Sequence, residues 1–247
     1  MVERATPTGP VRELVSGTTR HGRQRLGDPQ PLSYYHRAGS LGDAVSSLRA
    51  PAGARRFGFV GLGVGAAAAH LAPGDRGVFL EIDPAVVRLA RARFGYLQSA
   101  RGEVEVLEGD ARALLRTRAE RFDLLLVDAF AGDAIPTHLL TREAVRLAMQ
   151  RVAPQGVLLF HVSNRFFDLR PLLAAAARDL GYELAWRERL RDLASGEDPS
   201  RYVALARGAD ALAPLRARGW RGPRGLPAMD AWTDDHADPL SLWLRAR

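Results

Sequence analysis

The chain has 247 residues, of which 47% are hydrophobic, and its 35 basic and 28 acidic side chains give a formal charge of +7. All 35 basic residues are arginine and there is no cysteine, which excludes disulfides, thiolate metal sites, a cysteine nucleophile and a lysine Schiff base. The length and apolar fraction fit one soluble domain of generous size with a small appendage.

The first residues lack the order of a secretory signal, in which a basic segment precedes an apolar one, so we expect a cytoplasmic protein. Residues 57–74 carry no charge and approach the length of a short membrane span. Their repeated glycines and Pro-Gly end favour a strand, a turn and a helix start instead, and we expect no membrane partner.

Short apolar runs alternate with helical patterns from residue 55 onward. Five runs are typical of buried strands: residues 56–60, 77–81, 104–107, 122–127 and 157–162. Helices are predicted at residues 66–71, 84–94, 111–118, 142–152 and 169–180. This alternation predicts an α/β fold with a Rossmann-like, doubly wound and mainly parallel sheet that carries helices on both faces.

The two ends of the chain add further elements. Residues 182–187 and 201–206 predict a late antiparallel hairpin at the edge of the sheet. Residues 11–24 predict a short N-terminal β-hairpin, or lid, that cannot fold alone. We therefore divide the chain into an N-terminal hairpin segment, residues 1–50, and a Rossmann-like domain, residues 51–247.

A glycine-rich turn follows the first predicted strand and opens a helix. Gly61, Gly63 and Gly65 let backbone N–H groups approach a ligand at the helix N-terminus. Glu81 ends the second strand about 20 positions on, where a carboxylate can accept hydrogen bonds from ribose hydroxyls. The spacing favours a nucleoside ligand over a turn that serves packing alone.

Two more acids follow the next strands. Asp110 comes after the third strand and Asp128 ends the fourth, so both should meet Glu81 in one crevice at the carboxyl edge of the sheet. Asp110 also suits the N-cap of the helix that follows, and the sequence leaves its two roles open. A carboxylate that closes an apolar strand is costly without a partner, which favours a functional role for Asp128.

The remaining polar residues give weaker signals. His161 and Asn164 follow the fifth strand, where a place at the rim of the crevice and a satisfied strand-end pair are the two alternatives, and the pair is favoured. The six histidines include no metal-spaced pair with nearby acids, so we expect no metal. Interspersed arginines are more typical of a solvated surface than of a nucleic-acid interface, which argues against a nucleic-acid partner.

Several segments together resemble the spermidine synthase (polyamine aminopropyltransferase) family, in particular its bacterial spermidine-synthase-like branch. They are FVGLGVG at 59–65, EID at 81–83, GDAR at 109–112 and DAFAGDAIP at 128–136. HGRQ at 21–24 and PLSYYH at 31–36 look like the entry hairpin of that family, and MDAWTDD at 229–235 looks like the C-terminal element of the branch. The resemblance implies the class I S-adenosylmethionine methyltransferase fold.

The resemblance also implies an activity: transfer of an aminopropyl group from decarboxylated S-adenosylmethionine to an amine such as putrescine. Asp128 would orient and deprotonate the amine, with Tyr35 lining its channel. The nucleoside would be bound by Gln24, Gly61, Gly63, Gly65, Glu81, Asp83, Asp110 and Ala111. The substrate would be bound by Tyr34, His36, Asp133, Asp234 and Asp235. Outside this resemblance, Gln24 fits a solvated hairpin residue, and the two tyrosines fit a core pair over the sheet.

Three positions depart from the pattern of the family. Val64 lies where aminopropyltransferases usually carry an acid in the glycine loop, and Arg37 follows His36 where the family has an acid. Asp133 lies farther from Asp128 than the second acid of the usual Asp-x-x-Asp. Each buried ammonium of a polyamine needs a paired carboxylate, and at these three positions the acids of the family are absent or displaced. The sequence therefore does not fix the amine acceptor.

Two other functions stay open at this point. One is methyl transfer from S-adenosylmethionine on the same fold, and the other is a basic nucleic-acid-binding or regulatory protein without turnover. The sequence is also compatible with a homodimer.

Overall fold

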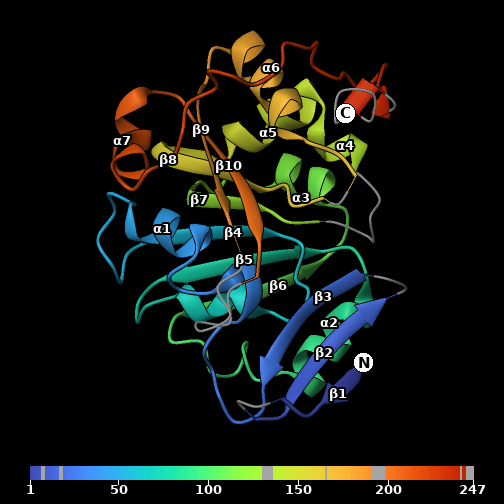
Figure 1. Ribbon diagram of the computed structural model, residues 1–247. Coiled ribbons are helices and arrows are strands. Elements are labelled where there is room, and N and C mark those ends of the chain that lie inside the picture. Colours follow the sequence, from blue (N-terminus) through green and yellow to red (C-terminus); the bar gives the residue numbers. More distant parts are fainter. Residues whose placement is uncertain are drawn as a thin grey trace.

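The computed structural model describes residues 1–6, 9–16, 19–129, 136–164, 166–190, 198–239 and 241–242. Its main sheet has the strand order β6-β5-β4-β7-β8-β10-β9 (Figure 1). The strands are β4 (Arg56–Val60), β5 (Arg76–Glu81), β6 (Glu103–Glu108), β7 (Phe122–Val127), β8 (Val152–His161), β9 (Glu183–Arg189) and β10 (Ser200–Ala206). Strands β4 to β8 are parallel and β10 runs antiparallel to both β8 and β9. The predicted sheet and its late hairpin are confirmed.

Helices cover both faces of this sheet. On one face lie α1 (Ser40–Ser46), the 3-10 turn η2 (Ala66–His70), α2 (Pro84–Arg93) and α7 (Ala209–Ala217). On the other lie α3 (Ala111–Thr117), α5 (Arg142–Gln150) and α6 (Arg170–Leu180), with the short α4 (Thr137–Leu140) before α5. Strand side chains alternate between the two layers, since Leu124 and Leu126 pack in one core and Leu125 and Val127 in the other.

Several elements differ from the prediction. The segment predicted as a helix at residues 66–71 is the 3-10 turn η2, and α1, α4, α7 and the 3-10 turn η1 (Ser33–Tyr35) were not predicted. Gly42 lies inside α1 and Pro214 inside α7, and both residue types argue against a helix in the sequence. Strand β8 begins at Val152 rather than at residue 157. The prediction missed its first residues because a proline such as Pro154 argues against a strand.

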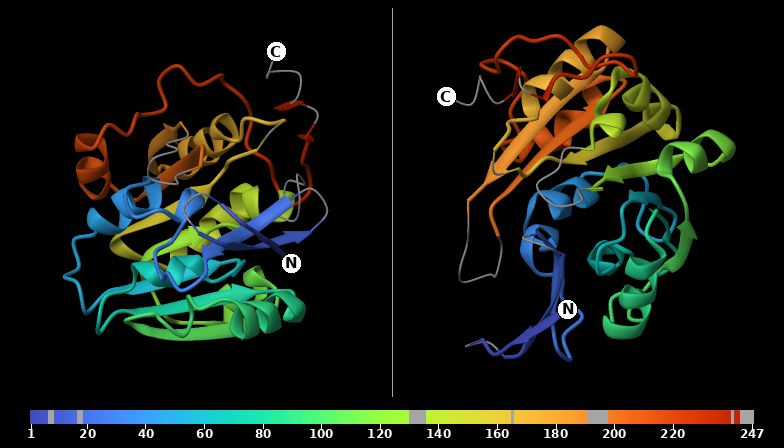
Figure 2. Two further views of the ribbon diagram at one scale, coloured as in Figure 1. Left: turned by 60° about the horizontal axis from the view of Figure 1, so that its bottom comes forward. Right: turned by 90° about the vertical axis from the view of Figure 1, so that its right-hand side faces the viewer.

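The N-terminal segment forms its own antiparallel sheet in the order β1-β2-β3, from β1 (Val2–Arg4), β2 (Val11–Ser16) and β3 (Thr19–Arg25). The predicted hairpin is therefore confirmed, and β1 adds a strand to it. Figure 2 shows this sheet in blue beside the main one. The Tyr96 hydroxyl donates to the backbone oxygen of Arg23 at 3.0 Å, which ties β3 to the loop after α2. The division of the chain at residue 50 stays a prediction.

Asp75 anchors the turn that leads into β5, at the amino end of the parallel strands. Its buried carboxylate accepts backbone N–H groups of Gly53 at 2.8 Å, Ala72 at 2.8 Å and Arg55 at 3.1 Å, and it pairs with the Arg55 guanidinium. Burial opposes ionisation of Asp75, but the hydrogen bonds from Arg55, Ala72 and Gly53 prevail and lower its pKa.

We expect Asp75→Asn to lower the unfolding free energy by about 2 kcal/mol at pH 7, because charge-assisted hydrogen bonds are lost. Since the folded-state pKa lies below the ordinary value of 3.8, the contribution of the carboxylate is full above that value and is lost as the pH falls through the folded pKa. Urea unfolding at pH 7 and pH 3 should show the difference from wild type shrinking at the lower pH. The exposed Asp230→Asn is the control, and equal effects of both variants would contradict the assignment.

Candidate active site

The glycine turn after β4 is enclosed on two sides by backbone. Gly61 and Gly63 have φ angles of 95° and 54°, in the left-handed region. A Cβ on Gly61 would lie 2.2 Å from the backbone oxygen of Asp128, and one on Gly63 would lie 2.5 Å from that of His21. The turn therefore lies between the end of β7 and the N-terminal hairpin, and Gly65, with φ of 81°, leads into η2.

The three predicted acids lie at the carboxyl edge of four adjacent strands. Glu81 ends β5. The backbone N–H of Gly109, just before Asp110, donates to the backbone oxygen of Glu81 at 2.8 Å, and the backbone N–H of Asp128 donates to the backbone oxygen of Val60 at 2.9 Å. Neighbouring strands lie about 5 Å apart, so the backbones from Asp110 to Asp128 span about 15 Å. That span suits one adenosine derivative laid across the strand ends.

The Glu81 carboxylate holds the glycine turn in place through hydrogen bonds from backbone N–H groups. One of its carboxylate oxygens accepts the Leu62 N–H and the other accepts the Asp83 N–H, both at 2.9 Å. Each oxygen keeps a further lone pair for a ligand. Ile82, the next residue, is 68% exposed.

The other predicted nucleoside residues already hold structural hydrogen bonds. Asp83 caps α2 through the Ala85 N–H at 2.7 Å, and Asp110 caps α3 through the Ala113 N–H at 2.9 Å, just before Ala111 begins that helix. For Asp110, the structure thus shows the capping role that the sequence left open. Nucleoside contacts by these residues stay a prediction.

Gln24 is buried, so the interpretation as a solvated hairpin residue is wrong. Its Oε1 accepts the Gly95 N–H at 2.7 Å, and its Nε2 donates to the Asp28 oxygen at 3.3 Å. The first bond joins β3 to the loop after α2, and the second is local to the segment that follows β3. Contact between Gln24 and a nucleoside stays a prediction.

Asp128 lies at the centre of a buried polar cluster. The Tyr35 hydroxyl donates to Asp128 Oδ2, and His161 Nδ1 lies 2.8 Å from Asp128 Oδ1. The Asp128 and His161 side chains are only 8% and 6% exposed. Burial of Tyr35, and next the charge of Asp128, raise the Tyr35 pKa well above its ordinary value of 10.0. Tyr35 therefore stays protonated and acts as a hydrogen-bond donor.

His161 is the residue of this cluster that the sequence interpretation did not place in the site. Its ring stacks on that of Tyr34 with centroids 4.2 Å apart and lies 4.8 Å from that of Tyr202. The position of His161 beside Asp128 follows from the strand register, because Val127 pairs with Phe160 on the parallel strands β7 and β8. The residue that follows each of them, Asp128 or His161, therefore lies at the same edge.

The segment that carries Tyr34 and Tyr35 is fixed through its backbone. The Tyr34 oxygen accepts from the Tyr202 hydroxyl at 3.1 Å, and the Tyr35 oxygen lies 2.7 Å from His70 Nε2. Burial lowers the pKa of His70 to about 4, so its ring is neutral at pH 7 and donates to this carbonyl. His36, next in the chain, accepts the Ala38 N–H at 3.2 Å in a local turn.

The structure gives the acidic residues of the C-terminal segment other surroundings than the Asp128 cluster. Asp234 forms a two-pronged ion pair with Arg112, at 2.6 and 2.8 Å, and accepts the Thr141 hydroxyl at 2.7 Å, while Asp235 is exposed. Substrate binding by either stays a prediction, and Asp133 lies outside the described residues.

The described residues contain neither a metal-binding cluster nor a membrane-spanning helix. In that part of the chain, no three His, Asp or Glu side chains are placed to hold a metal ion. Nor does it contain a helix long and apolar enough to cross a bilayer.

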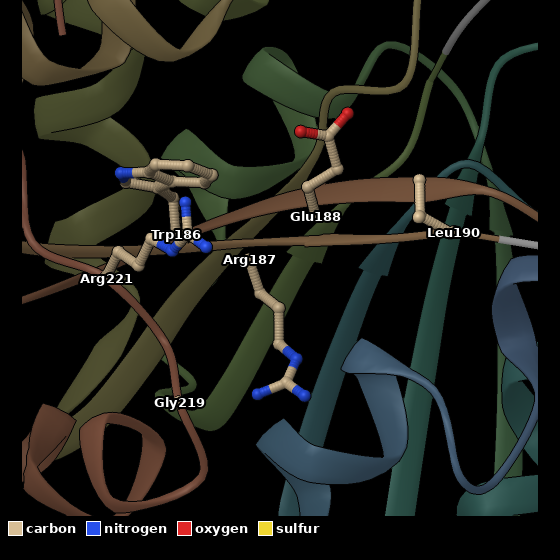
Figure 3. Close-up of a pocket in the computed structure, with 6 residues that line it drawn as sticks. All are labelled: Trp186, Arg187, Glu188, Leu190, Gly219 and Arg221. Atoms are coloured by element: carbon tan, nitrogen blue, oxygen red, sulfur yellow. The ribbon is translucent and has the colours of Figure 1, made fainter. Parts of the chain in front are cut away.

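A hollow of about 360 Å³ lies along the outer strand β9, lined by Trp186, Arg187, Glu188, Leu190, Gly219 and Arg221. Figure 3 shows Trp186 and Glu188 on one side of the strand and Arg187 on the other. The Arg170 guanidinium covers the Trp186 ring at 4.3 Å. Strands β8 and β10 separate β9 from β7, so this hollow lies away from the glycine turn and Asp128.

Comparison with known proteins gives a consistent result. No family model matches the chain. Over 117 residues, 45% of this chain, it is 37% identical to the polyamine aminopropyltransferase of Vibrio vulnificus (strain CMCP6). The match spans 38% of that relative, so this chain covers less than half of the relative's length.

Two solved structures share the fold. A probable spermidine synthase from Corynebacterium glutamicum ATCC 13032 has a TM-score of 0.66 and 17% identity, and the match covers 96% of this chain and 99% of that one. Human methyltransferase-like protein 13, solved in complex with SAH, has a TM-score of 0.57 and 18% identity, over 82% of this chain and 97% of that one.

The fold is therefore the one that these two structures share, a probable spermidine synthase and a methyltransferase-like protein. Within that fold, the chain is a homologue of the V. vulnificus polyamine aminopropyltransferase over 45% of its own length. The resemblance that the motifs indicated is confirmed.

Proposed function

We propose that the protein transfers an aminopropyl group from decarboxylated S-adenosylmethionine to a small amine such as putrescine. One observation carries the proposal: the buried Asp128 carboxylate, held by Tyr35 and His161, lies beside the glycine turn at the carboxyl edge of the sheet. The homologous V. vulnificus protein, named a polyamine aminopropyltransferase, supports the same reaction class.

The chemistry depends mainly on placement. When bound, the sulfonium nucleoside supplies an activated carbon and a thioether leaving group. The glycine turn and Glu81 hold the nucleoside, and the Asp128 cluster holds the amine in line with that carbon. Placing two reactants in this way supplies about 7 kcal/mol or more of the rate enhancement. An alkylamine arrives protonated at neutral pH, so Asp128 must accept its proton or orient its free form.

The reaction itself is tested by product analysis. The protein is incubated with decarboxylated S-adenosylmethionine, or with S-adenosylmethionine, and with putrescine, cadaverine and longer amines in turn. We expect methylthioadenosine and an elongated amine with the decarboxylated donor. If neither donor is consumed with any of these amines, the proposed function is overturned.

Glu81→Gln should weaken binding of methylthioadenosine by about 10- to 100-fold, because hydrogen bonds to a charged acceptor contribute about 1.5–3 kcal/mol. Isothermal calorimetry measures the change. Glu108 lies on β6, where it pairs in register with Glu81 of β5, and it is exposed. Glu108→Gln is therefore the matched control and should bind methylthioadenosine as wild type does. Unchanged affinity in Glu81→Gln would remove Glu81 from the nucleoside site.

Methyl transfer is a second candidate, and a specific observation favours it. Val64, at the position where aminopropyltransferases usually carry an acid, is fully buried. It packs so closely on β3 that a Cβ on Gly22 would lie 2.5 Å from Val64 Cγ2. This position offers no carboxylate to the amino group of the donor. Tighter binding of S-adenosylmethionine than of the decarboxylated nucleoside would favour methyl transfer.

A further inference from the structure

A second buried polar cluster joins three segments that lie far apart in the chain. Asp198 Oδ2 accepts the Ser33 hydroxyl at 2.7 Å and lies 3.2 Å from Arg23 Nη2. Arg23 belongs to β3, Ser33 begins η1, and Asp198 lies two residues before β10. Ser33 is 1% exposed and the Asp198 side chain 12%, so their hydrogen bond is shielded from water. We call these three residues the Asp198 cluster.

Ser33 has a backbone conformation that requires support. Its φ angle is 61°, and among the described residues it is the one non-glycine residue with a positive φ. A left-handed backbone is unfavourable for a residue with a Cβ and persists only where surrounding contacts hold it. The hydrogen bond from Ser33 to the Asp198 carboxylate is such a contact, because charge-assisted hydrogen bonds are stronger than neutral ones. The Asp198 cluster therefore stabilises the start of η1.

The turn that starts at Ser33 carries Tyr35 to the Asp128 carboxylate. Tyr35 follows Ser33 by two residues and ends η1, and its hydroxyl donates to Asp128 Oδ2. A 3-10 turn of this length has poor hydrogen-bond geometry and little stability of its own. Its end is held at the Tyr35 backbone oxygen by His70, and its start is held by the Asp198 cluster. The position of the Tyr35 side chain therefore depends on both supports.

Arg23 connects the Asp198 cluster to a fixed part of the fold. The backbone oxygen of Arg23 accepts the Tyr96 hydroxyl at 3.0 Å. Gly22, the preceding residue on β3, packs against Val64 of the glycine turn. The Arg23 side chain is only 20% exposed, so its pairing with Asp198 is partly protected from screening by salt. Arg23 thus holds Asp198 from a strand that is itself docked on the glycine turn.

We propose that Asp198 is a positioning residue that acts through η1 to hold the Tyr35 hydroxyl on Asp128. Ser33 transmits its effect to the turn, and Arg23 keeps Asp198 in place. The proposal rests on the proposed function.

The consequence for the reaction follows from the orientation of the Asp128 carboxylate. With Tyr35 at Oδ2 and His161 at Oδ1, this carboxylate keeps one orientation and presents its remaining lone pairs to the amine. Without Asp198, the start of η1 is released, Tyr35 shifts and Asp128 turns more freely. The amine is then placed less accurately, whereas the nucleoside keeps its contacts with Glu81 and the glycine turn.

The test is a double-mutant cycle of Asp198→Ala and Tyr35→Phe. Each single change should lower kcat/KM for the amine about 100-fold, the loss that a misplacement of about 1 Å causes, while methylthioadenosine binds as tightly as before. In the Tyr35→Phe background, Asp198→Ala should cause less than about 3-fold further loss, because both changes remove the same hydroxyl contact. Wild-type kcat/KM in Asp198→Ala, or additive losses in the double variant, would overturn the proposal. Asp75→Asn, which weakens the fold at the other edge of the sheet, is the control and should keep the wild-type kcat/KM.

Ser33→Gly separates positioning from support of the backbone. Glycine adopts a φ of 61° without strain, but the hydrogen bond to Asp198 is lost. The unfolding free energy should stay close to that of wild type, because relief of strain offsets the lost bond. We expect kcat/KM for the amine to fall as it does in Asp198→Ala. Wild-type kcat/KM in Ser33→Gly would mean that Asp198 supports only the backbone, and the proposal would be wrong.

A further measurement does not depend on turnover. The Tyr35 hydroxyl proton, identified by its absence in Tyr35→Phe, should give a slowly exchanging NMR signal in the wild type and in Asp75→Asn. The signal should be lost in Asp198→Ala, and its persistence there would overturn the proposal. Failure of transfer with every donor would overturn the proposed function, and the NMR result would still decide whether Asp198 holds Tyr35 on Asp128, so the two failures are distinguishable.

Discussion

Asp128→Asn is expected to lower kcat by about 10²- to 10⁴-fold, the usual contribution of a general base, while methylthioadenosine binds as tightly as before. The asparagine keeps the shape of the side chain but cannot accept the proton of the amine. The Asp128 side chain is 8% exposed, so water has little access to replace it. Single-turnover kinetics with putrescine, together with calorimetry, would separate chemistry from nucleoside binding.

The matched control for this substitution lies on the same strand. Asp123 is the second residue of β7 and lies at the edge of the sheet opposite Asp128. Its Oδ2 accepts the Arg56 N–H at 2.8 Å. Asp123→Asn keeps an acceptor for that bond and should turn over at the wild-type rate. Wild-type turnover in Asp128→Asn would remove Asp128 from its proposed role.

Gly61→Ala is expected to lower the unfolding free energy by about 4 kcal/mol, through two additive causes. A left-handed backbone costs a residue with a Cβ about 1–2 kcal/mol, and overpacking against a fixed neighbour costs about 1–3 kcal/mol more. The neighbour here is the backbone oxygen of Asp128, 2.2 Å from the added Cβ. Urea unfolding measures the loss.

Two other glycines separate these causes. Gly181, the C-cap of α6, has φ of 70° and open space around its Cβ position, so Gly181→Ala should cost only the backbone part, about 1 kcal/mol. Gly208 has φ of −142° and open space, so Gly208→Ala should be close to neutral. If Gly61→Ala is no worse than Gly181→Ala, the close approach of Asp128 does not constrain the turn.

The parallel core of the fold could be predicted because its strands are buried on both faces and appear as continuous apolar runs. Residues 122–127 show this, and β7 has the predicted bounds. The N-terminal strand β1 pairs with β2 through backbone bonds, and its exposed residues give no apolar signal. Helices α1 and α7 were hidden by Gly42 and Pro214, whose local preferences tertiary packing overrides.

Site residues that directly follow a recognisable strand could be predicted from the sequence. The glycine turn, Glu81 and Asp128 each follow a recognisable strand, so their common edge could be inferred. The contact of Asp128 with His161 depends on the register between β7 and β8, which a single sequence does not give. The burial of Gln24 depends on where the N-terminal sheet docks, and hairpin periodicity contains no information about that.

The tight fit of Gly22 over Val64 links strand β3 of the N-terminal sheet to the glycine turn after β4, 42 residues further along the chain. Since both occupy one small volume, neither can be enlarged unless the other makes room or the N-terminal strands shift. Evolution of a glutamate at position 64, whose side chain is longer than that of valine, would therefore require a compensating change in the hairpin. Across descendants of this gene, the two sites should covary.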